Sequence, residues 1–490
     1  MPSTRGPWIL AAAILGSSLA FIDGTVVNVA LPAIQSGLGA TLAEVQWIVA
    51  AYALTLAALL LTGGSLGDLY GRRRIFSLGV VVFTAASAWC GFSPNVTQLV
   101  AARALQGVGG ALLVPGSLAL ITASFSDDDR GRAIGTWSAF TSITAALGPV
   151  LGGWLVQHLS WRWAFFINLP IAALVLVITL ARVPESRGGD TDGPRHVDVS
   201  GAMLTTFGLA GITFSLIEHV PWAGLAGIAL LVVFVFVEAR EHTPMLPLSL
   251  FKSATFSGAN VLTLFLYTSL SGVLVFLPMN LISVQGYSAT AAGAALLPFI
   301  ALMFVLSRWA GGLVQRYGAR RPLIIGPVIA AAGFALFARP SIGGSYWATF
   351  FPATVVLGLG MAVTVAPLTT AVMGAVPSER AGVASGVNNA VSRVAGLFGI
   401  AALGLVLSIA FNRSLDDRMT SANVSPQERS RIDAQRSLLA GARVDDPHGR
   451  AAVDAAFVDG FRLVVLIAAA LAIASALATV VLIRDSPQRE

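Results

Sequence analysis

The long apolar stretches of this sequence contain very few ionisable residues, and these few are of types that carry protons or bind charged groups. Asp23 lies well inside the first stretch, Arg103 inside the fourth, and Arg393 near the middle of the thirteenth. An ionisable group at membrane depth is costly unless it is paired or hydrated, so each of these residues is a functional candidate. Asp23 and Arg103 are expected at one depth, where a carboxyl group beside an arginine can exchange a proton.

This pair has two interpretations that the sequence leaves open. In the first, Asp23 gains a proton after a substrate leaves and loses it when a substrate binds, which couples the two movements. In the second, Asp23 and Arg103 form a structural ion pair between two helices. Proton coupling by Asp23 and Arg103 is the leading prediction.

Further polar and aromatic residues accompany these charges at helical spacing. Gln106 shares a helix face with Arg103, and Asn389 shares one with Arg393. Such polar stripes must face a cavity or another helix. We predict a substrate cavity lined by Asn28, Tyr52, Gln106, Trp137, Phe140, Asn389 and Arg393. For the aromatic members, plain packing is the alternative.

The composition restricts the classes of protein to which the chain can belong. Charged residues make up 11% of its 490 residues, whereas soluble chains hold about 25%. Hydrophobic residues make up 56%, which excludes a disordered chain. The single cysteine excludes an intramolecular disulfide, and no clustered ligands suggest a metal site. The net charge of +6 comes from short clusters between apolar runs, so we expect no nucleic acid partner.

Fourteen apolar runs are long enough to cross a membrane as helices, each requiring about 20 residues. They span approximately 8–31, 45–66, 75–93, 97–123, 133–157, 163–182, 200–219, 222–239, 255–282, 290–312, 322–338, 346–374, 383–411 and 457–483. The short loops assigned to the inner side hold most of the loop arginines, whereas only Arg162 and Arg339 fall in short outer loops. The positive-inside rule therefore predicts that both termini are cytoplasmic.

A degenerate second copy of one pattern indicates an internal repeat. Gly64 and Asp68 precede a basic cluster in the first half, and Gly311 precedes a similar cluster in the second. We predict an N-terminal six-helix bundle at 8–183, a cytoplasmic linker at 184–199, two inserted helices at 200–240 and a C-terminal six-helix bundle at 255–483. The loop 412–456 is predicted to be either a short amphipathic helix or hairpin, or a flexible loop.

Several segments together resemble the major facilitator superfamily, and within it the fourteen-helix drug:proton antiporter family. The most specific match is the loop Gly64-Ser-Leu-Gly-Asp68-Leu-Tyr-Gly71-Arg72-Arg73-Arg74. The stretches Phe21–Pro32, Arg103–Ala111 and Trp161–Pro170 resemble further motifs of the family. Gly148-Pro149-Val-Leu-Gly152-Gly153 resembles its antiporter motif, although Thr144 stands where that motif usually has another glycine. The resemblance covers nearly the whole chain.

The resemblance implies an all-α integral membrane protein of fourteen transmembrane helices that works by alternating access. It implies a latch that holds the cytoplasmic side closed, which we place at Gly64, Asp68, Gly71, Arg72, Arg73, Asp128 and Arg130. In this latch the arginines are expected to pair with the acids at 127–129. The glycines of helices 4 and 5 are expected to allow close helix contacts, and Pro149 to kink its helix.

The leading functional hypothesis is export of lipophilic or amphiphilic small molecules in exchange for protons, as in multidrug efflux. The alternative is export of anionic or zwitterionic amphiphiles, such as lipids or a specific metabolite. No Walker-type loop occurs and the histidines are scattered, so we expect neither ATP use nor enzymatic activity. We expect no cofactor, a monomer surrounded by membrane lipids, and a location in the bacterial inner membrane.

Overall fold

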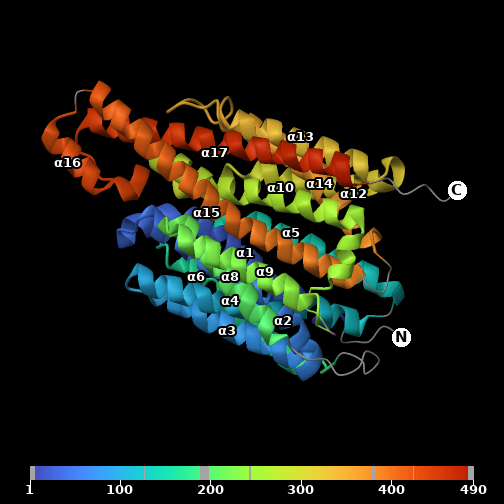
Figure 1. Cartoon of the computed structure of the whole chain (residues 1–490). Helices are drawn as coiled ribbons and strands as arrows, with labels where there is room; N and C mark the ends of the chain where they lie inside the picture. The colour runs from blue at the N-terminus through green and yellow to red at the C-terminus, as the bar shows by residue number, and fades with distance from the viewer. Residues whose placement is uncertain are drawn as a thin grey trace. The chain divides into compact units, whose positions relative to one another are not determined.

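The structure is a computed structural model in which all the regular secondary structure of the described residues is helical (Figure 1). It describes residues 6–125, 127–187, 198–241, 244, 246–376, 381–422 and 424–483. The predicted all-α fold class is confirmed. Contacts between Cα atoms divide the chain into two units: unit 1 comprises Met1–Ala30 and Trp47–Pro247, and unit 2 comprises Leu31–Gln46 and Leu248–Glu490.

The helices of the first half of the chain begin close to the predicted apolar runs. They are α1 (Gly6–Leu38), α2 (Leu42–Tyr70), α3 (Arg72–Phe92), α4 (Val96–Ser124), α5 (Asp127–His158), α6 (Trp163–Phe166), α7 (Asn168–Arg182), α8 (Val199–Glu218) and α9 (Pro221–Glu238). Side chains cap three of them. The Glu44 amide donates to Thr41 Oγ1 over 3.2 Å at the start of α2, the Gln98 amide donates to Asn95 Oδ1 over 3.0 Å at the start of α4, and the Gly201 amide donates to Asp198 Oδ1 over 2.7 Å at the start of α8.

The second half of the chain contains the remaining helices. They are η2 (Leu248–Lys252), α10 (Ala254–Met279), η3 (Asn280–Val284), α11 (Ala289–Ala294), α12 (Leu297–Tyr317), α13 (Arg320–Leu336), α14 (Phe350–Gly374), α15 (Ala381–Ser421), α16 (Pro426–Ala434), η5 (Arg436–Gly441) and α17 (Pro447–Leu482). The η3 segment is a single π-helical turn that continues α10.

Twelve helices of the described residues are long and apolar enough to cross a membrane. The two other predicted spans are helical as well: α5 has 32 residues and α13 has 17. At a rise of 1.5 Å per residue, α13 extends about 26 Å. The observed helices are therefore compatible with the predicted number of fourteen, which remains a prediction.

Two predicted spans, 163–182 and 290–312, are each broken into two helices. The first break follows α6, which ends four residues before Pro170, and the second follows α11, which ends four residues before Pro298. A proline ring clashes with the carbonyl group four residues earlier and offers no N–H group. Proline therefore accounts for an interruption within each span. As a whole, each of the two stretches is still long and apolar enough to cross a membrane, as predicted.

The region 412–456 is helical for most of its length. The helix α15 extends ten residues beyond the predicted end at residue 411, and α17 starts ten residues before the predicted start at residue 457. Between them, the Glu428 amide donates to Ser425 Oγ over 3.3 Å and caps α16. Gln35 Nε2 donates to the Leu438 carbonyl over 3.0 Å, which fastens η5 to the end of α1. The region thus contains the short helix α16, whereas its predicted amphipathic character stays a prediction.

The internal repeat inferred from the sequence has a structural counterpart in the glycine contacts of each half. A Cβ atom on Gly109 of α4 would lie 2.7 Å from the Cα atom of Phe83 on α3. A Cβ atom on Gly360 of α14 would likewise lie 2.7 Å from the Cα atom of Ala330 on α13. Both helix pairs therefore approach so closely that only glycine fits at the crossing.

The helices α8 and α9, which the sequence predicts to be inserted between two bundles, form a closely packed pair within unit 1. Gly208 and Gly211 of α8 meet Gly227 of α9, with no room for a larger residue. Trp47 Nε1 of α2 donates to Glu218 Oε1 over 2.7 Å. This hydrogen bond ties the pair to α2.

Candidate functional site

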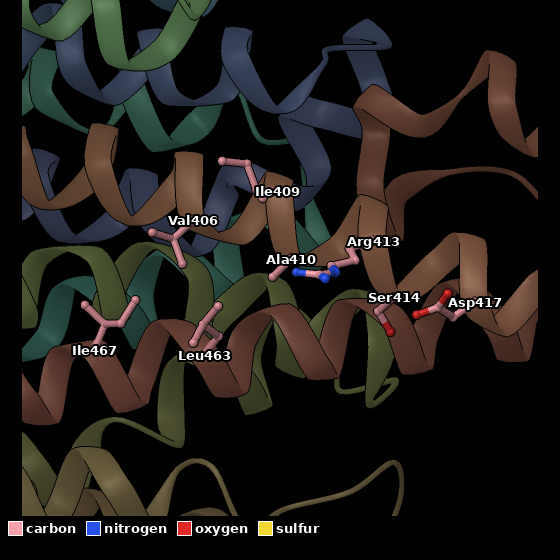
Figure 2. Close-up of a pocket in the computed structure, with 8 residues that line it drawn as sticks. All are labelled: Val406, Ile409, Ala410, Arg413, Ser414, Asp417, Leu463 and Ile467. Atoms are coloured by element: carbon pink, nitrogen blue, oxygen red, sulfur yellow. The ribbon is translucent and has the colours of Figure 1, made fainter.

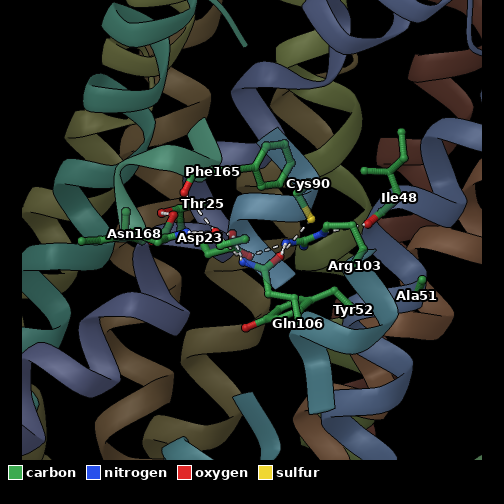
Figure 3. A network of polar contacts seen from close by, with 12 residues as sticks. Asp23, Thr25, Ile48, Ala51, Tyr52, Cys90, Arg103, Gln106, Phe165 and Asn168 are labelled. Carbon is green, nitrogen blue, oxygen red and sulfur yellow. Dashed lines mark hydrogen bonds and ion pairs between the residues drawn. The ribbon is translucent and has the colours of Figure 1, made fainter. Parts of the chain in front are cut away.

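A charged pair lies at the centre of unit 1, and its two members come from α1 and α4 (Figure 3). Arg103 Nη1 lies 2.5 Å from Asp23 Oδ2, and the two side chains are 1% and 0% exposed. Removing a pair of charges from water costs several kcal/mol per ion, so a buried pair needs further hydrogen bonds to be stable. The depths predicted from the sequence bring these two residues together correctly.

Arg103 also has contacts that do not involve Asp23. Its Nε donates to the Ile48 carbonyl over 3.0 Å, and its Nη1 donates to Gln106 Oε1 over 2.6 Å. Its guanidinium carbon lies 4.3 Å from the centre of the Tyr52 ring, a cation–π contact. These contacts hold the arginine against α2 and its own helix.

The carboxylate of Asp23 receives hydrogen bonds from two amide side chains. Gln106 Nε2 donates to Asp23 Oδ1 over 2.8 Å, and Asn168 Nδ2 of α7 donates to the same oxygen over 3.4 Å. Both amides also donate to Ser87 Oγ of α3, over 3.2 and 2.9 Å. Four helices therefore contribute to one buried network around Asp23.

Sequence reasoning missed three members of this network. Ser87 and Cys90 lie on α3, and Asn168 lies on α7; all three are buried. The Cys90 thiol donates to Gln106 Oε1 over 3.7 Å. Asn168 had a usable signal, because it is an amide within an apolar run that resembles a family motif. Ser87 and Cys90 had none, since small polar residues are common in membrane helices.

The motif Gly148–Gly153 of α5 packs on α1 beside Asp23. A Cβ atom on Gly148 would overlap Thr25 Oγ1, and a Cβ atom on Gly152 would lie 3.0 Å from the Cα atom of Val26. Pro149 lies inside α5, and Gly153 is buried. The glycines therefore allow α5 to contact α1 within three residues of the buried carboxylate.

The aromatic residues predicted to line a cavity in unit 1 have different surroundings. Tyr52 is buried beneath Arg103, and Trp137 Nε1 donates to Ser17 Oγ over 3.0 Å. Phe140 is 51% exposed. The three aromatic side chains therefore lie in different environments, and the structure does not bring them together.

Asn28, the amide predicted to line the same cavity, lies on α1. Its side chain is half-buried, and its Oδ1 atom is buried without a hydrogen-bond partner among the described residues. A buried amide oxygen normally accepts a hydrogen bond. Asn28 therefore has an acceptor to offer to a ligand.

In unit 2, the predicted cavity residues lie on α15. Asn389 is exposed and Arg393 is half-buried. The neighbouring Asn388, which sequence reasoning missed, donates from Nδ2 to Asn260 Oδ1 over 3.1 Å and to Thr263 Oγ1 over 2.8 Å. The buried polar contact of this helix is thus one residue from the predicted stripe.

The loop after α2 is held by acids other than those expected. Arg72 Nη2 lies 2.9 Å from Asp68 Oδ1, and the Arg73 amide donates to Glu185 Oε1 over 3.0 Å. Gly71 adopts a φ of 112°, which favours glycine, and a Cβ atom there would lie 2.8 Å from the Glu185 carboxyl. Asp68 and Glu185 thus contact the arginines of this loop, whereas the side chains at 127 and 128, with which pairing was expected, lie outside the described residues. Glu185, which follows the sixth predicted span, was missed.

The other residues of the predicted latch can be placed only in part. Gly64 faces Pro115 of α4, whose Cβ atom would be 3.7 Å from an added Cβ atom. Asp128 and Arg130 belong to α5, and their side chains lie outside the described residues. Asp129, between them, forms an exposed pair with Arg132 over 3.7 Å.

Comparison with known proteins shows the family. The sequence profile of the Major Facilitator Superfamily matches residues 13–400. The chain belongs to this superfamily. Among solved structures, the chain resembles that of a bacterial homolog to the human lysosomal transporter Spinster. The TM-score is 0.68 at 18% identity, and the comparison covers 99% of this chain and 100% of that one. The xylose transporter XylE from E. coli gives a TM-score of 0.61 and 15% identity, covering 98% and 100%. At this identity the two structures support the fold alone.

Similar superfamily members are named for drug resistance and export. The multidrug resistance protein Stp of Mycobacterium tuberculosis (strain CDC 1551 / Oshkosh) is 34% identical, with 94% of this chain and 89% of that protein covered. The tetracenomycin C resistance and export protein of Streptomyces glaucescens is also 34% identical, with 96% and 90% covered. The chain is thus a multi-pass membrane protein of a transporter family rather than an enzyme.

Proposed function

We propose that the protein is a proton-coupled antiporter that exports lipophilic or amphiphilic small molecules by alternating access. One observation carries the proposal: Asp23, a fully buried carboxylate in the middle of a membrane helix, has its hydrogen-bond donors on α4 and α7. Relatives at 34% identity are named as resistance or export proteins. In this proposal, a proton on Asp23 is exchanged for a substrate.

Protonation of Asp23 would remove its charge while leaving Arg103 in place. Arg103 keeps its bond to the Ile48 carbonyl, its bond to Gln106 and its contact with the Tyr52 ring. A neutral carboxyl group loses the Coulomb attraction that holds it to the guanidinium. The proton therefore weakens the tie between α1 and α4 from the α1 side alone.

The contact between α1 and α5 does not depend on this charge. Gly148 and Gly152 meet Thr25 and Val26 through van der Waals contact. When Asp23 is neutral, α1 stays packed on α5 while its tie to α4 is weakened. We propose that this imbalance converts proton binding into helix movement.

The proton gradient supplies energy of the right size for this step. One pH unit contributes about 1.4 kcal/mol and 100 mV contributes about 2.3 kcal/mol per charge. Breaking a buried ion pair from one side costs about 3–5 kcal/mol. The two quantities are similar, so a proton driven by the gradient can compensate for the loss of the pair. This energy source requires no bound cofactor.

The orientation proposed from the loop arginines places both termini in the cytoplasm of a bacterial cell, with the protein in the inner membrane as a monomer. The contacts of Asp68 with Arg72, and of Glu185 with Arg73, would then lie on the cytoplasmic side. There we propose that they act as the latch between α2, α3 and the segment after α7.

The test uses the purified full-length protein in proteoliposomes that contain a pH-sensitive dye. Ethidium, added to the side from which it is taken up, should cause proton release from the parent protein. Asp23→Asn should abolish this release while ethidium still exchanges between the two sides, because the neutral side chain cannot carry a proton. Asp445→Asn, at an exposed carboxylate, is the matched control.

The outcomes separate the two roles of the buried pair. Loss of proton release with retained exchange supports coupling through Asp23. Unchanged proton release in Asp23→Asn would leave the pair with a structural role only, and the proposed mechanism would be abandoned.

Export of anionic or zwitterionic amphiphiles is the second candidate, and it rests on Arg393. This half-buried cation lies on a membrane helix. The helix α12 contains no acidic residue that could serve as a counter-charge for a cationic substrate. An arginine is suited to phosphate or carboxylate groups. Arg393→Ala should then reduce export of anionic substrates while ethidium export is retained. An equal loss for both substrates would contradict this alternative.

A further inference from the structure

The helices α15 and α17 enclose a groove in unit 2 that is far in sequence from the network around Asp23 (Figure 2). Its volume is about 440 Å³. Val406 of α15 and Leu463 and Ile467 of α17 form its apolar part, and Arg413 and Asp417 of α15 lie toward its polar end. Leu463 is 43% exposed, so the apolar part is open to the surroundings of the helix pair.

The groove lies where the two helices change from apolar to charged sequence. Residues 394–412 of α15 contain no charged side chain, and Arg413 is the first to follow. On α17, residues 463–482 contain none, and Arg462 directly precedes them. Each apolar segment is about long enough to cross the hydrocarbon layer. The boundary between hydrocarbon and headgroups is therefore expected to cross the groove.

Charged residues next to the groove are already paired with one another. Arg418 Nη2 lies 2.6 Å from Asp459 Oδ2, and Arg462 Nη1 lies 3.5 Å from Asp459 Oδ1. Ser414 Oγ donates to Asp459 Oδ2 over 2.6 Å. This set satisfies itself and offers little to a ligand.

Arg413 and Asp417 differ from their neighbours in this respect. Both are exposed, and among the described residues neither side chain has an ion-pair or hydrogen-bond partner; Ser421 Oγ donates only to the Asp417 backbone carbonyl. They are four residues apart, so their Cβ atoms lie about 5–6 Å apart on one helix face. Figure 2 shows the guanidinium of Arg413 directed back along α15 toward Ala410, beside the apolar part. The groove thus offers one cation and one anion in a fixed order.

We propose that this groove binds a phospholipid with a primary amine in its headgroup. From the apolar part outward, the order is hydrocarbon wall, Arg413 and Asp417, which matches acyl chain, phosphate and ammonium in such a lipid. Arginine binds phosphate through two parallel hydrogen bonds. A carboxylate accepts hydrogen bonds from an ammonium group. An anionic lipid without the amine could pair its phosphate with Arg413, but it would leave the negative charge of Asp417 without a partner. The bound lipid would join α15 to α17.

The test compares three lipids with identical acyl chains: phosphatidylethanolamine, phosphatidylcholine and phosphatidylglycerol. The full-length protein is delipidated in detergent, each lipid is added, and retained lipid is counted by native mass spectrometry. The parent should retain phosphatidylethanolamine best. Phosphatidylcholine should bind less well, because its quaternary ammonium has no N–H donor for Asp417.

Three variants test the separate parts of the groove. Arg413→Ala should lower retention of phosphatidylethanolamine about tenfold, because a hydrogen bond to a charged group is lost. Asp417→Asn should remove the preference for phosphatidylethanolamine over phosphatidylglycerol. Ala410→Phe should reduce binding of all three lipids, because its ring fills the groove and leaves both charges in place.

Arg339→Ala is the control, since it removes an exposed arginine outside the groove. Arg413→Gln is measured beside Arg413→Ala as a second neutral variant, and both should unfold at the parent temperature without lipid, because Arg413 has no partner to lose. Parent protein that retains phosphatidylglycerol as well as phosphatidylethanolamine would overturn the proposal. So would unchanged retention in Arg413→Gln or in Ala410→Phe. Because the readout is lipid retention, these results do not depend on whether Asp23 couples protons.

Discussion

Arg103 and Gln106, one turn apart on α4, are joined by a hydrogen bond of 2.6 Å from Nη1 to Oε1, and this bond directs the amide group of Gln106 toward Asp23. Because Oε1 accepts from the arginine, Nε2 is left to donate to Asp23 Oδ1 and to Ser87 Oγ. The glutamine thus connects the cation and the anion of the pair a second time. Its role is to position both charges.

Replacement of this glutamine by leucine should destabilise the protein and reduce transport. Gln106→Leu has a similar volume but removes a donor to Asp23 and an acceptor for Arg103, both fully buried. Leaving such groups unpaired costs about 1–3 kcal/mol. Thermal unfolding in detergent and ethidium transport in proteoliposomes measure the two effects. Gln98→Leu, at an exposed glutamine on the same helix, is the control, and equal losses in both variants would refute the positioning role.

A double-mutant cycle should show that Asp23 and Arg103 depend on each other. Arg103→Leu leaves Asp23 buried without its cation, which costs about 3–5 kcal/mol. Adding Asp23→Asn removes the unpaired charge, so the double variant should be more stable than Arg103→Leu alone. Denaturant or thermal unfolding of all four proteins gives the coupling free energy. Additive losses in the two single variants would show that the pair contributes no mutual stabilisation.

The sequence predicts the central pair because both residues stand out chemically. Asp23 and Arg103 are charged residues inside apolar runs, and helix geometry gives their depth from residue counts alone. Gln106 follows from Arg103 by helical spacing. The partners contributed by α3 and α7 do not follow, because which helices are neighbours depends on packing between distant segments. Ser87 is an example, since it contacts Gln106 and Asn168 but resembles many other serines in its sequence context.

The helix positions are also predictable to a limited degree. The apolar runs locate the helices, because each helix must bury its apolar side chains in protein or expose them to lipid. The runs do not show where a helix breaks or continues. Pro170 and Pro298 follow interruptions of two helices within apolar runs. Pro115 lies inside the unbroken α4, so the proline rule alone would not have told these positions apart. In contrast, α15 continues through polar residues up to Ser421. That extension depends on contacts such as Arg418 with Asp459 of α17, which hydropathy does not show.

Alanine at the matched glycines Gly109 and Gly360 should destabilise both halves to a similar degree. Each added Cβ atom would lie 2.7 Å from the Cα atom of a residue on the neighbouring helix, and backbone cannot yield as a flexible side chain does. Overpacking of this kind costs about 1–3 kcal/mol. Gly312→Ala is the control, because no atom lies within 4 Å of its added Cβ. Thermal unfolding checks the prediction, and tolerance of Gly109→Ala at the level of Gly312→Ala would contradict the close helix approach.

Asp198, which caps α8 before its membrane segment, should make a pH-dependent contribution to stability. Burial alone would raise the pKa of Asp198, but hydrogen bonds from the Gly201 amide, the Glu238 carboxyl and the Ser200 hydroxyl together lower that pKa below its usual value. A carboxyl group with a depressed pKa stabilises the fold above its unfolded pKa of about 3.9, and this contribution is lost as the pH falls through the folded value. The stabilisation is therefore fully present at neutral pH.

Asp198→Ala should accordingly lower stability by about 1 kcal/mol at neutral pH, the usual cost of losing a helix cap. The difference from the parent should shrink below about pH 4, because the parent then loses the charge that the variant lacks. Glu238→Gln is the matched variant, since its amide can donate to Asp198 in place of the Glu238 carboxyl. It should be at least as stable as the parent. Thermal unfolding of the three proteins in detergent across this pH range measures the effect, and a difference between Asp198→Ala and the parent that grows below about pH 4 would reverse the assigned sign.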